Sequence, residues 1–182
     1  MSYKTLIYQK TGAVSTITIN RPAANNAINV RLASELADIC ANINRDEETR
    51  VVIITGAGEE AFCVGVDLTE LSWLVGRKRE TRLLSVATPV ASLKSPVIAA
   101  INGDALGQGL ELALACDLRI TVETARFALP HVASCPVPWD GATQRLPRLV
   151  GKSKAMEMLL TGESVDATEA YQIGLVSKVI LP

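Results

Sequence analysis

Short apolar runs separated by turn residues dominate the hydrophobic pattern of the chain. The ranges 3–9 and 14–19 are rich in β-forming residues and are joined through Thr11-Gly12, which predicts a β-hairpin. The range 50–55 is a largely apolar run that stops at Gly56. A strand that is apolar on both faces indicates a sheet covered by helices.

Helical spacing follows the hairpin. Asn29 is a suitable N-cap, and the apolar residues after it recur at every third or fourth position, which predicts a helix that buries Leu32, Leu36 and Ile39. Because strands and helices alternate further along the chain, we expect one α/β domain over residues 1–182. The pattern predicts helices beginning near Asp67 and after Asp166, helices over 77–94, 108–115 and 152–160, and strands over 96–101, 118–122 and 176–180.

Composition narrows the functional classes. The 182 residues carry 18 Lys and Arg against 19 Asp and Glu, and only 4% are aromatic, so neither charge nor base-stacking side chains favour nucleic-acid binding. No apolar run approaches the ~20 residues that span a bilayer, and no apolar segment of a signal peptide follows Met1. We therefore expect a cytoplasmic protein with neither nucleic-acid nor membrane partners.

Potential metal ligands are sparse. The four cysteines are widely spaced and form no CxxC pair, which favours reduced core residues over disulfides or zinc ligands. They are Cys40, Cys63, Cys116 and Cys135. His131 is the single histidine, so a multi-histidine metal site within this chain is excluded, and we predict no metal site.

One glycine-rich motif is interpreted as a plain turn. Residues 56–61 match the GxGxxA dinucleotide fingerprint after a predicted strand. Glu59 and Glu60 would repel a pyrophosphate, and no acid follows at the usual distance of roughly 20 residues. We therefore predict no dinucleotide cofactor at this turn.

Two other segments, 61–68 and 102–111, place small residues directly before a predicted helix. Free backbone N–H groups at helix starts carry partial positive charge, so two such starts aimed at one point would form an oxyanion hole. Glycines in these turns would let a substrate approach the backbone closely. Strand-to-helix turns also contain glycine for purely structural reasons, so the pattern alone leaves both interpretations open.

Glu111 and His131 are candidate proton-transfer residues, and each has a structural alternative. Glu111 stands among Leu and Ala on the first turn of the helix predicted over 108–115. This pattern favours a solvated acid near the helix dipole over a buried functional one. His131 follows Pro130 in an apolar context, where a histidine is more often a hydrogen-bonded core residue than a catalyst.

Several motifs occur in a specific order and spacing that covers nearly the whole chain. They are Asn20-Arg21-Pro22 with Asn26-Ala27, the ranges 61–68, 101–117 and 141–146, Gly151-Lys152, and Gly174-Leu175-Val176. Each motif is weak by itself. Together they resemble the crotonase superfamily, also called the enoyl-CoA hydratase/isomerase family.

The resemblance implies a spiral of strand–strand–helix units, an acyl-CoA thioester substrate with no further cofactor, and a homotrimer or a hexamer of two trimers. It also implies that the backbone N–H groups of Val66 and Gln108 form an oxyanion hole and that Glu111 is a catalytic carboxylate. The residues that it places at the CoA or the substrate are Ala24, Asn25, Ala61, Val64, Gly65, Asp67, Leu68 and Gly107.

The sequence departs from the family pattern at the site itself. His131 stands where typical hydratases carry a second glutamate, and Gln108 replaces the middle glycine of a usual triple, so its side chain projects near the acyl site. Some branches carry an acid at the position of Trp139, which leaves open whether Asp140 reaches the site. Relatives usually continue as C-terminal helices, so the resemblance also implies that such a part is missing after Pro182.

These features favour one function over several rivals. We expect an enoyl-CoA hydratase, a lyase of fatty-acid metabolism, in which two N–H donors stabilise a thioester enolate while Glu111 and His131 transfer protons. Double-bond isomerisation is the nearest alternative, because one carboxylate can move a proton between two carbons. Hydrolysis of a thioester or C–C bond is another. The non-enzyme alternative is an acyl-CoA-binding relative with weak catalysis, against which the presence of Glu111 argues.

Overall fold

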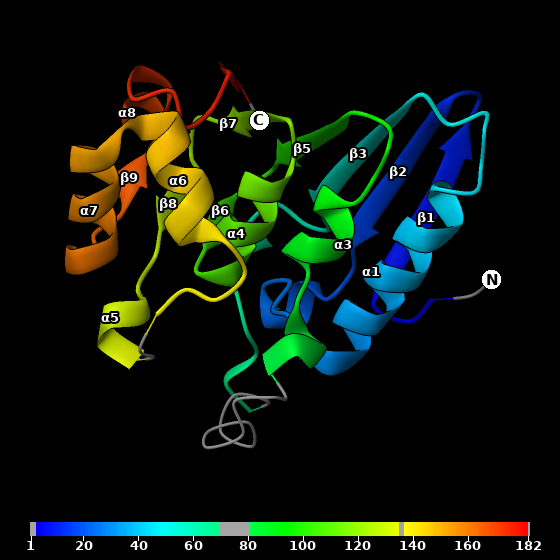
Figure 1. The fold of residues 1–182 in the computed structure, drawn as a ribbon, viewed down its shortest axis with the longest axis horizontal. Helices are drawn as coiled ribbons and strands as arrows, with labels where there is room; N and C mark the ends of the chain where they lie inside the picture. Colours follow the sequence, from blue (N-terminus) through cyan, green and yellow to red (C-terminus); the bar gives the residue numbers. More distant parts are fainter. Residues whose placement is uncertain (1–2, 70–80, 135–136, 182) are drawn as a thin grey trace.

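A six-stranded sheet forms the larger layer of the structure, a computed structural model that describes residues 3–69, 81–134 and 137–181 (Figure 1). The first two strands form the predicted hairpin and are antiparallel, whereas the remaining neighbours pair in parallel. In sheet order the strands are β1 (Leu6–Thr11), β2 (Val14–Ile19), β3 (Val51–Gly56), β5 (Val97–Ile101), β7 (Leu118–Val122) and β10 (Lys178–Ile180).

A second sheet of very short strands lies beside the first. Its first three strands are parallel, and the last is antiparallel to its neighbour. In sheet order they are β4 (Ala61–Cys63), β6 (Asp104–Leu106), β8 (Arg126–Ala128) and β9 (Val165–Asp166). The chain passes from the large sheet to the small one and then into helical structure three times in succession. The expected spiral of strand–strand–helix units is therefore confirmed.

Helices cover these sheets and form one end of the molecule. In Figure 1, α1 and α3 lie in front of the large sheet, while α6, α7 and α8 gather with β8 and β9 at the opposite end. The helices are α1 (Val30–Ile43), α3 (Ala87–Ala91), α4 (Gln108–Ala115), α5 (His131–Ser134), α6 (Ala142–Val150), α7 (Lys152–Thr161) and α8 (Ala167–Gln172), with 3₁₀ turns η1 (Pro22–Ala24) and η2 (Thr81–Leu84).

Local sequence signals explain where the longest helix begins and which face it buries. The Asn29 side chain accepts a hydrogen bond from the Leu32 amide at 2.8 Å, which confirms the predicted N-cap. Leu32 and Leu36 are fully buried. Burying a leucine side chain contributes about 1.5–3 kcal/mol, so this face, rather than helix propensity, holds α1 on the sheet.

The helix predicted over 77–94 is wrong in its described part. Residues 81–91 form η2 and then α3, with a break at Ser85 and Val86. The amides of Val86 and Ala87 instead donate to the Asp140 carboxylate, at 2.7 and 2.9 Å. A partner more than fifty residues away therefore ends the local periodicity. Residues 77–80, and most of the helix expected near Asp67, lie outside the described residues.

Two kinds of element went unpredicted. The strands of the small sheet have only three, three, three and two residues, too few for an alternating pattern to be recognised; they are β4, β6, β8 and β9. Helix α6 contains Pro147, and because proline is unfavourable inside a helix, the sequence did not predict a helix there.

The segment 56–61 is the end of β3 followed by a bend, as the interpretation of a plain turn requires.

The cysteines of the described residues behave as expected for core thiols. Cys40, Cys63 and Cys116 are buried and free, whereas Cys135 lies outside the described residues. Burial raises the pKa of each of the three described thiols to about 12, so they stay protonated near neutral pH. Within the described part of the chain, no helix is both long and apolar enough to span a membrane.

Candidate active site

Three parallel strands of the small sheet point their carboxyl ends at the same region. Beyond these ends, β4 leads to Val66, β6 leads to Gln108 and β8 leads to His131. In α/β proteins, ligands bind beyond the carboxyl ends of parallel strands. The topology thus collects three separately predicted site residues at one edge.

The amide of Val66 faces away from its nearest backbone neighbour. Val66 forms an isolated parallel bridge with Ile28, whose amide donates to the Gly65 carbonyl at 2.7 Å and whose carbonyl accepts from the Asp67 amide at 2.8 Å. In a parallel bridge the partner bonds only to the flanking residues, so the N–H of Val66 points to the other side. That side is the one on which β4 pairs with β6.

The turn before α4 approaches this loop closely. A Cβ atom added to Gly65, whose φ is +94°, would lie 3.0 Å from the Leu106 carbonyl oxygen and 3.1 Å from the Gln108 amide nitrogen. A Cβ added to Gly109 would lie only 1.9 Å from the Cys63 carbonyl oxygen. Only glycines allow this contact, and it holds the amide of Gln108, the first residue of α4, beside the 65–66 loop.

Glu111 is buried rather than solvated. Its side chain is fully inaccessible, so the interpretation as a solvent-exposed dipole-stabilising acid is wrong. Its Oε1 atom accepts hydrogen bonds from the amides of Asp140 and Ala142, at 3.0 and 2.9 Å, while Oε2 has no partner among the described residues. Burial raises the pKa of Glu111 to about 7, against the opposing effect of the two amide donors.

His131 faces the free oxygen of Glu111. Its Nε2 atom lies 3.9 Å from Glu111 Oε2, and its ring meets the Trp139 ring edge-on with a centroid distance of 5.9 Å. Burial lowers the pKa of His131, so the imidazole is neutral at pH 7. Its Nδ1 atom has no hydrogen-bond partner among the described residues. The expectation of a hydrogen-bonded core histidine is therefore not met.

Asp140 turns its carboxylate away from the acid–base pair. It accepts from the Ser85 hydroxyl at 2.7 Å and from the two amides at the start of α3. Its side chain therefore organises the α3 segment, and only its backbone amide contacts Glu111. The same carboxylate accepts a hydrogen bond from Gln108 Nε2 at 3.0 Å.

Four buried polar side-chain atoms in the described residues lack any hydrogen-bond partner, and all four belong to this region. Native proteins contain few such atoms, and each one calls for an explanation. At a site, a bound ligand would supply the missing partners. The atoms are Gln108 Oε1, Glu111 Oε2, His131 Nδ1 and Trp139 Nε1.

The residues that the family resemblance places at the CoA or the substrate lie in two regions of the structure, the loops around 24–25 and 64–68 and the strands of the small sheet. Asn25 accepts a hydrogen bond from the Val64 amide at 3.3 Å, so the loop with Ala24 adjoins the 64–66 segment. Asp67 forms an ion pair with Arg21 at 3.0 Å, which clamps these two loops together. Leu68 is 73% exposed. Ala61 is the buried first residue of β4, and Gly107, which follows β6 and precedes α4, donates its amide to the Ala128 carbonyl.

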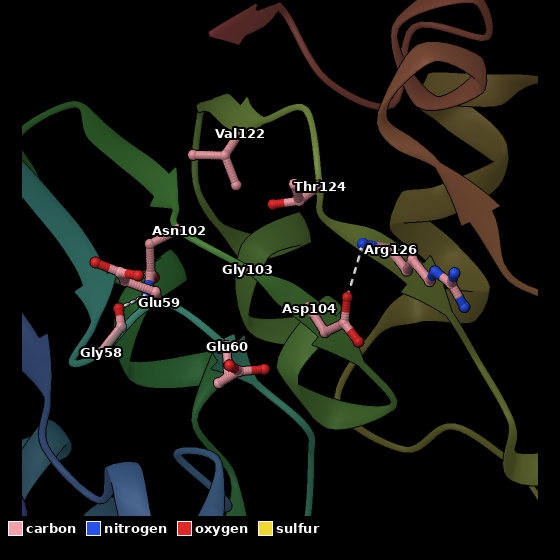
Figure 2. Close-up of a pocket in the computed structure, with 9 residues that line it drawn as sticks. All are labelled: Gly58, Glu59, Glu60, Asn102, Gly103, Asp104, Val122, Thr124 and Arg126. Atoms are coloured by element: carbon pink, nitrogen blue, oxygen red, sulfur yellow. Dashed lines mark hydrogen bonds between the residues drawn. The ribbon is translucent and has the colours of Figure 1, made fainter. Parts of the chain in front are cut away.

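The cavity of about 570 Å³ shown in Figure 2 lies elsewhere. It is lined where β4, β6 and β8 begin, including Glu60, Asp104 and Arg126. None of the candidate catalytic residues lines it. Among the residues that the structure describes, no group of three His, Cys, Asp or Glu side chains is placed to hold a metal ion.

Sequence reasoning missed several contributors to the site. The Leu84 carbonyl accepts from Gln108 Nε2 at 2.6 Å, Ser85 binds Asp140, and the Ala142 amide binds Glu111. Two of these contacts use backbone groups, which carry no residue-type signal. Ser85 lies 55 positions from its partner, so no spacing rule could have found it.

Comparison with known proteins fixes the family. A profile described as enoyl-CoA hydratase/isomerase matches residues 9–181. The chain belongs to this family. Its members include the crotonase-fold structures, and the spiral described above is their architecture.

Curated relatives and solved structures agree with this assignment. YngF of Bacillus subtilis, named as an enoyl-CoA hydratase/isomerase, is 48% identical over 93% of this chain and 66% of its own length. The short-chain-enoyl-CoA hydratase of Clostridium acetobutylicum is 42% identical over 100% of this chain and 71% of its own. The crystal structure of an enoyl-CoA hydratase from Bacillus anthracis superposes with a TM-score of 0.91 at 42% identity, covering 98% of this chain and 70% of that one. The chain thus spans about two thirds of the length of these relatives.

Proposed function

We propose that this protein hydrates 2-enoyl-CoA thioesters. The observation that carries the proposal is the cluster of unpartnered buried atoms around Glu111 and His131. Glu111 Oε2 and His131 Nε2 lie 3.9 Å apart, beyond the carboxyl ends of the parallel strands of the small sheet. The family assignment and the hydratase names of the relatives support it. The substrate would bring its own CoA, with no resident cofactor, and a homotrimer or paired trimers would be the assembly.

The thioester carbonyl would accept hydrogen bonds from the amides of Val66 and Gln108. As water adds to Cβ, negative charge moves onto this oxygen, and each donor would stabilise the resulting enolate. One donor of this kind typically contributes about 2.7–4 kcal/mol to the transition state. The close approach of Gly65 to the Gln108 amide supports this arrangement.

The protonation states suggest a division of labour between the two side chains. Neutral His131 would remove a proton from the attacking water, whose oxygen bonds to Cβ. Glu111, with a pKa of about 7, would donate its proton from Oε2 to Cα. The step leaves an imidazolium and a carboxylate. Proton return between Nε2 and Oε2, which lie 3.9 Å apart, would restore the starting state.

Product analysis tests the reaction class. Purified protein is incubated with 2-enoyl-, 3-enoyl- and saturated acyl-CoA thioesters, and the products are identified by absorbance and mass. Hydration predicts a 2-enoyl substrate that loses its conjugated double bond and gains the mass of one water. A shifted double bond at unchanged mass would instead establish isomerisation, and free CoA would establish hydrolysis. Tight binding without turnover would establish an acyl-CoA-binding relative.

The pH dependence of hydration tests the assigned roles. Because Glu111 must be protonated, the rate should fall as pH rises above about 7. Because His131 must be neutral, the rate should also fall at acidic pH, below the lowered pKa of its imidazole. The acidic limb should disappear in His131→Gln, and His131→Glu should retain more activity than His131→Gln. Identical profiles and equal rates in wild type and His131→Gln would remove His131 from the mechanism.

A further inference from the structure

The proposed hydration leaves two of the four unpartnered atoms unused. Glu111 and His131 transfer protons, whereas Gln108 Oε1 and Trp139 Nε1 have no part in the chemistry. Both belong to positions where this chain departs from the family pattern described above: Gln108 stands at the middle glycine of the usual triple, and Trp139 stands where some branches carry an acid. The hydrogen bonds that these two atoms can form therefore indicate which acyl groups this protein binds.

The orientation of the Gln108 amide is fixed by its neighbours. Its Nε2 atom donates to the Leu84 carbonyl at 2.6 Å and to Asp140 Oδ2 at 3.0 Å. Asp140 takes its other hydrogen bonds from donors, so this carboxylate acts only as an acceptor. A flipped amide would set its oxygen against two acceptors. Oε1 is thus left as a buried acceptor on a side chain that is only 1% exposed.

Trp139 supplies a donor directly before Asp140, the residue whose carboxylate binds the Gln108 amide. An indole N–H can donate but not accept, and this one is buried with no partner among the described residues, although the ring is partly exposed. The ring stands edge-on to His131, at an interplanar angle of 83°, and His131 in turn faces Glu111. The indole therefore borders the region of the acid–base pair.

The acyl chain would pass next to Gln108. The amide proposed to bind the thioester carbonyl belongs to this residue, so its side chain starts beside the first acyl carbons. From there it extends to the end of η2, where it binds Leu84. A glycine would leave this space open, whereas glutamine fills it. The acyl group that fits is therefore short.

The two unpartnered atoms restrict which chemical group can lie at the far end of the acyl chain. A hydroxyl can donate to Gln108 Oε1 and accept from Trp139 Nε1, which satisfies both. A carboxylate cannot donate and would approach the charge of Asp140, an ammonium group cannot accept, and a methyl group does neither. Resting on the proposed function, we propose that the substrate is a short acyl-CoA whose chain carries a hydroxyl group, held between Gln108 Oε1 and Trp139 Nε1.

Matched substrates test this preference directly. The values of kcat/KM are measured for 4-hydroxybut-2-enoyl-CoA and 5-hydroxypent-2-enoyl-CoA and compared with those for but-2-enoyl-CoA and pent-2-enoyl-CoA. Buried hydrogen-bonding groups left unpaired by an analogue cost about 5- to 100-fold, so at least one hydroxylated substrate should be preferred by that factor. Equal values for both pairs in the wild type would overturn the proposal.

Three substitutions locate the source of the preference. Gln108→Met keeps a chain of similar length but removes the acceptor, and Trp139→Phe keeps an aromatic ring but removes the donor. Each should lower the ratio between hydroxylated and plain substrates about tenfold. Gln144→Met makes the same chemical change on an exposed position of α6 and should leave the ratio unchanged. Because the readout is a ratio, a general loss of activity does not imitate the effect.

Binding separates a failure of this proposal from a failure of the hydratase assignment. Calorimetry with 4-hydroxybutanoyl-CoA and butanoyl-CoA, which cannot be hydrated, measures recognition alone. Tighter binding of the hydroxylated thioester without turnover of any enoyl-CoA would support the recognition site and refute the hydratase. Hydration with no hydroxyl preference, unaltered in Trp139→Phe, would refute the recognition site and leave the hydratase intact.

Discussion

The two ends of the small sheet differ in how their polar groups are satisfied. At the amino end, the Asp104 carboxylate accepts the Arg126 amide and the Asn102 side chain donates to the Gly58 carbonyl, as the dashed lines in Figure 2 show. At the carboxyl end, Glu111 and His131 keep unpartnered atoms in a buried setting. The cavity of about 570 Å³ thus lies at the end where no buried side-chain polar atom of the described lining residues lacks a hydrogen-bond partner.

The contrast between the two ends indicates that unpartnered buried polar atoms, rather than the presence of a cavity, mark a candidate functional site. A hollow lined by satisfied and exposed groups requires no ligand. Buried polar atoms without partners are costly, by about 1–3 kcal/mol each, and persist where a ligand completes them. Single substitutions that keep the shape of a side chain and change only its chemistry can therefore distinguish the two ends.

The largest effect is expected from Glu111→Gln. Glutamine keeps the shape and can accept the two amide hydrogen bonds at Oε1, but it cannot donate an acidic proton to Cα. The hydration rate should fall by about 10²–10⁴-fold. Steady-state kinetics measure this loss, and calorimetry with a saturated acyl-CoA should show that binding persists. A turnover near that of the wild type would transfer the proton donor's role to another residue.

The same substitution should stabilise the fold at high pH. Burial raises the pKa of Glu111 from 4.5 to about 7, so the native state holds a proton that the unfolded chain releases. This stabilisation is complete below pH 4.5 and is lost as pH rises through about 7, a change of about 3 kcal/mol. Glu111→Gln cannot ionise, so its advantage in unfolding free energy should be larger at pH 8 than at pH 5. Denaturant titrations at both values measure it, and a pH-independent difference would contradict the raised pKa.

A smaller loss is expected from Asp140→Asn. Asparagine can still accept the amides of Val86 and Ala87, but the hydrogen bonds are no longer charge-assisted. The unfolding free energy should fall by about 1 kcal/mol. The hydration rate should fall as well, because the turn that carries Asp140 also holds Glu111 through its backbone amide. An unchanged stability would show that the carboxylate does not organise the α3 segment.

The smallest effect is expected from the matched change at the other end, Asp104→Asn. The amide oxygen can still accept the Arg126 amide, and the position is only half-buried. Stability should change by no more than about 0.5 kcal/mol, and the hydration rate should stay within a factor of about two. A large loss of activity would place function at the amino-end cavity and break the contrast between the two ends.

Much of the fold could be read from local sequence because local physics decides it. The Asn29 cap, the hairpin turn at Gly12 and the Asp166 cap of α8, which accepts the Glu169 amide at 2.8 Å, each depend on neighbours a few residues away. Five strands of the large sheet have five or six residues, which is long enough to be recognised, and β10, with three, lies within the longer run predicted over 176–180. The strands of the small sheet are not recognisable in this way, because their pairing rather than their own sequence stabilises them.

The sequence by itself determined which residues are candidates for the proposed chemistry. It provided the glycine turns before Val66 and Gln108, the acid of Glu111, and the single histidine, His131. Only the tertiary structure decided the protonation states and the orientations of these side chains. Burial by distant segments raises one pKa and lowers the other, and contacts across more than twenty residues turn the Asp140 carboxylate away and fix the Gln108 amide. Desolvation and long-range hydrogen bonds depend on neighbours in space, which no local pattern specifies.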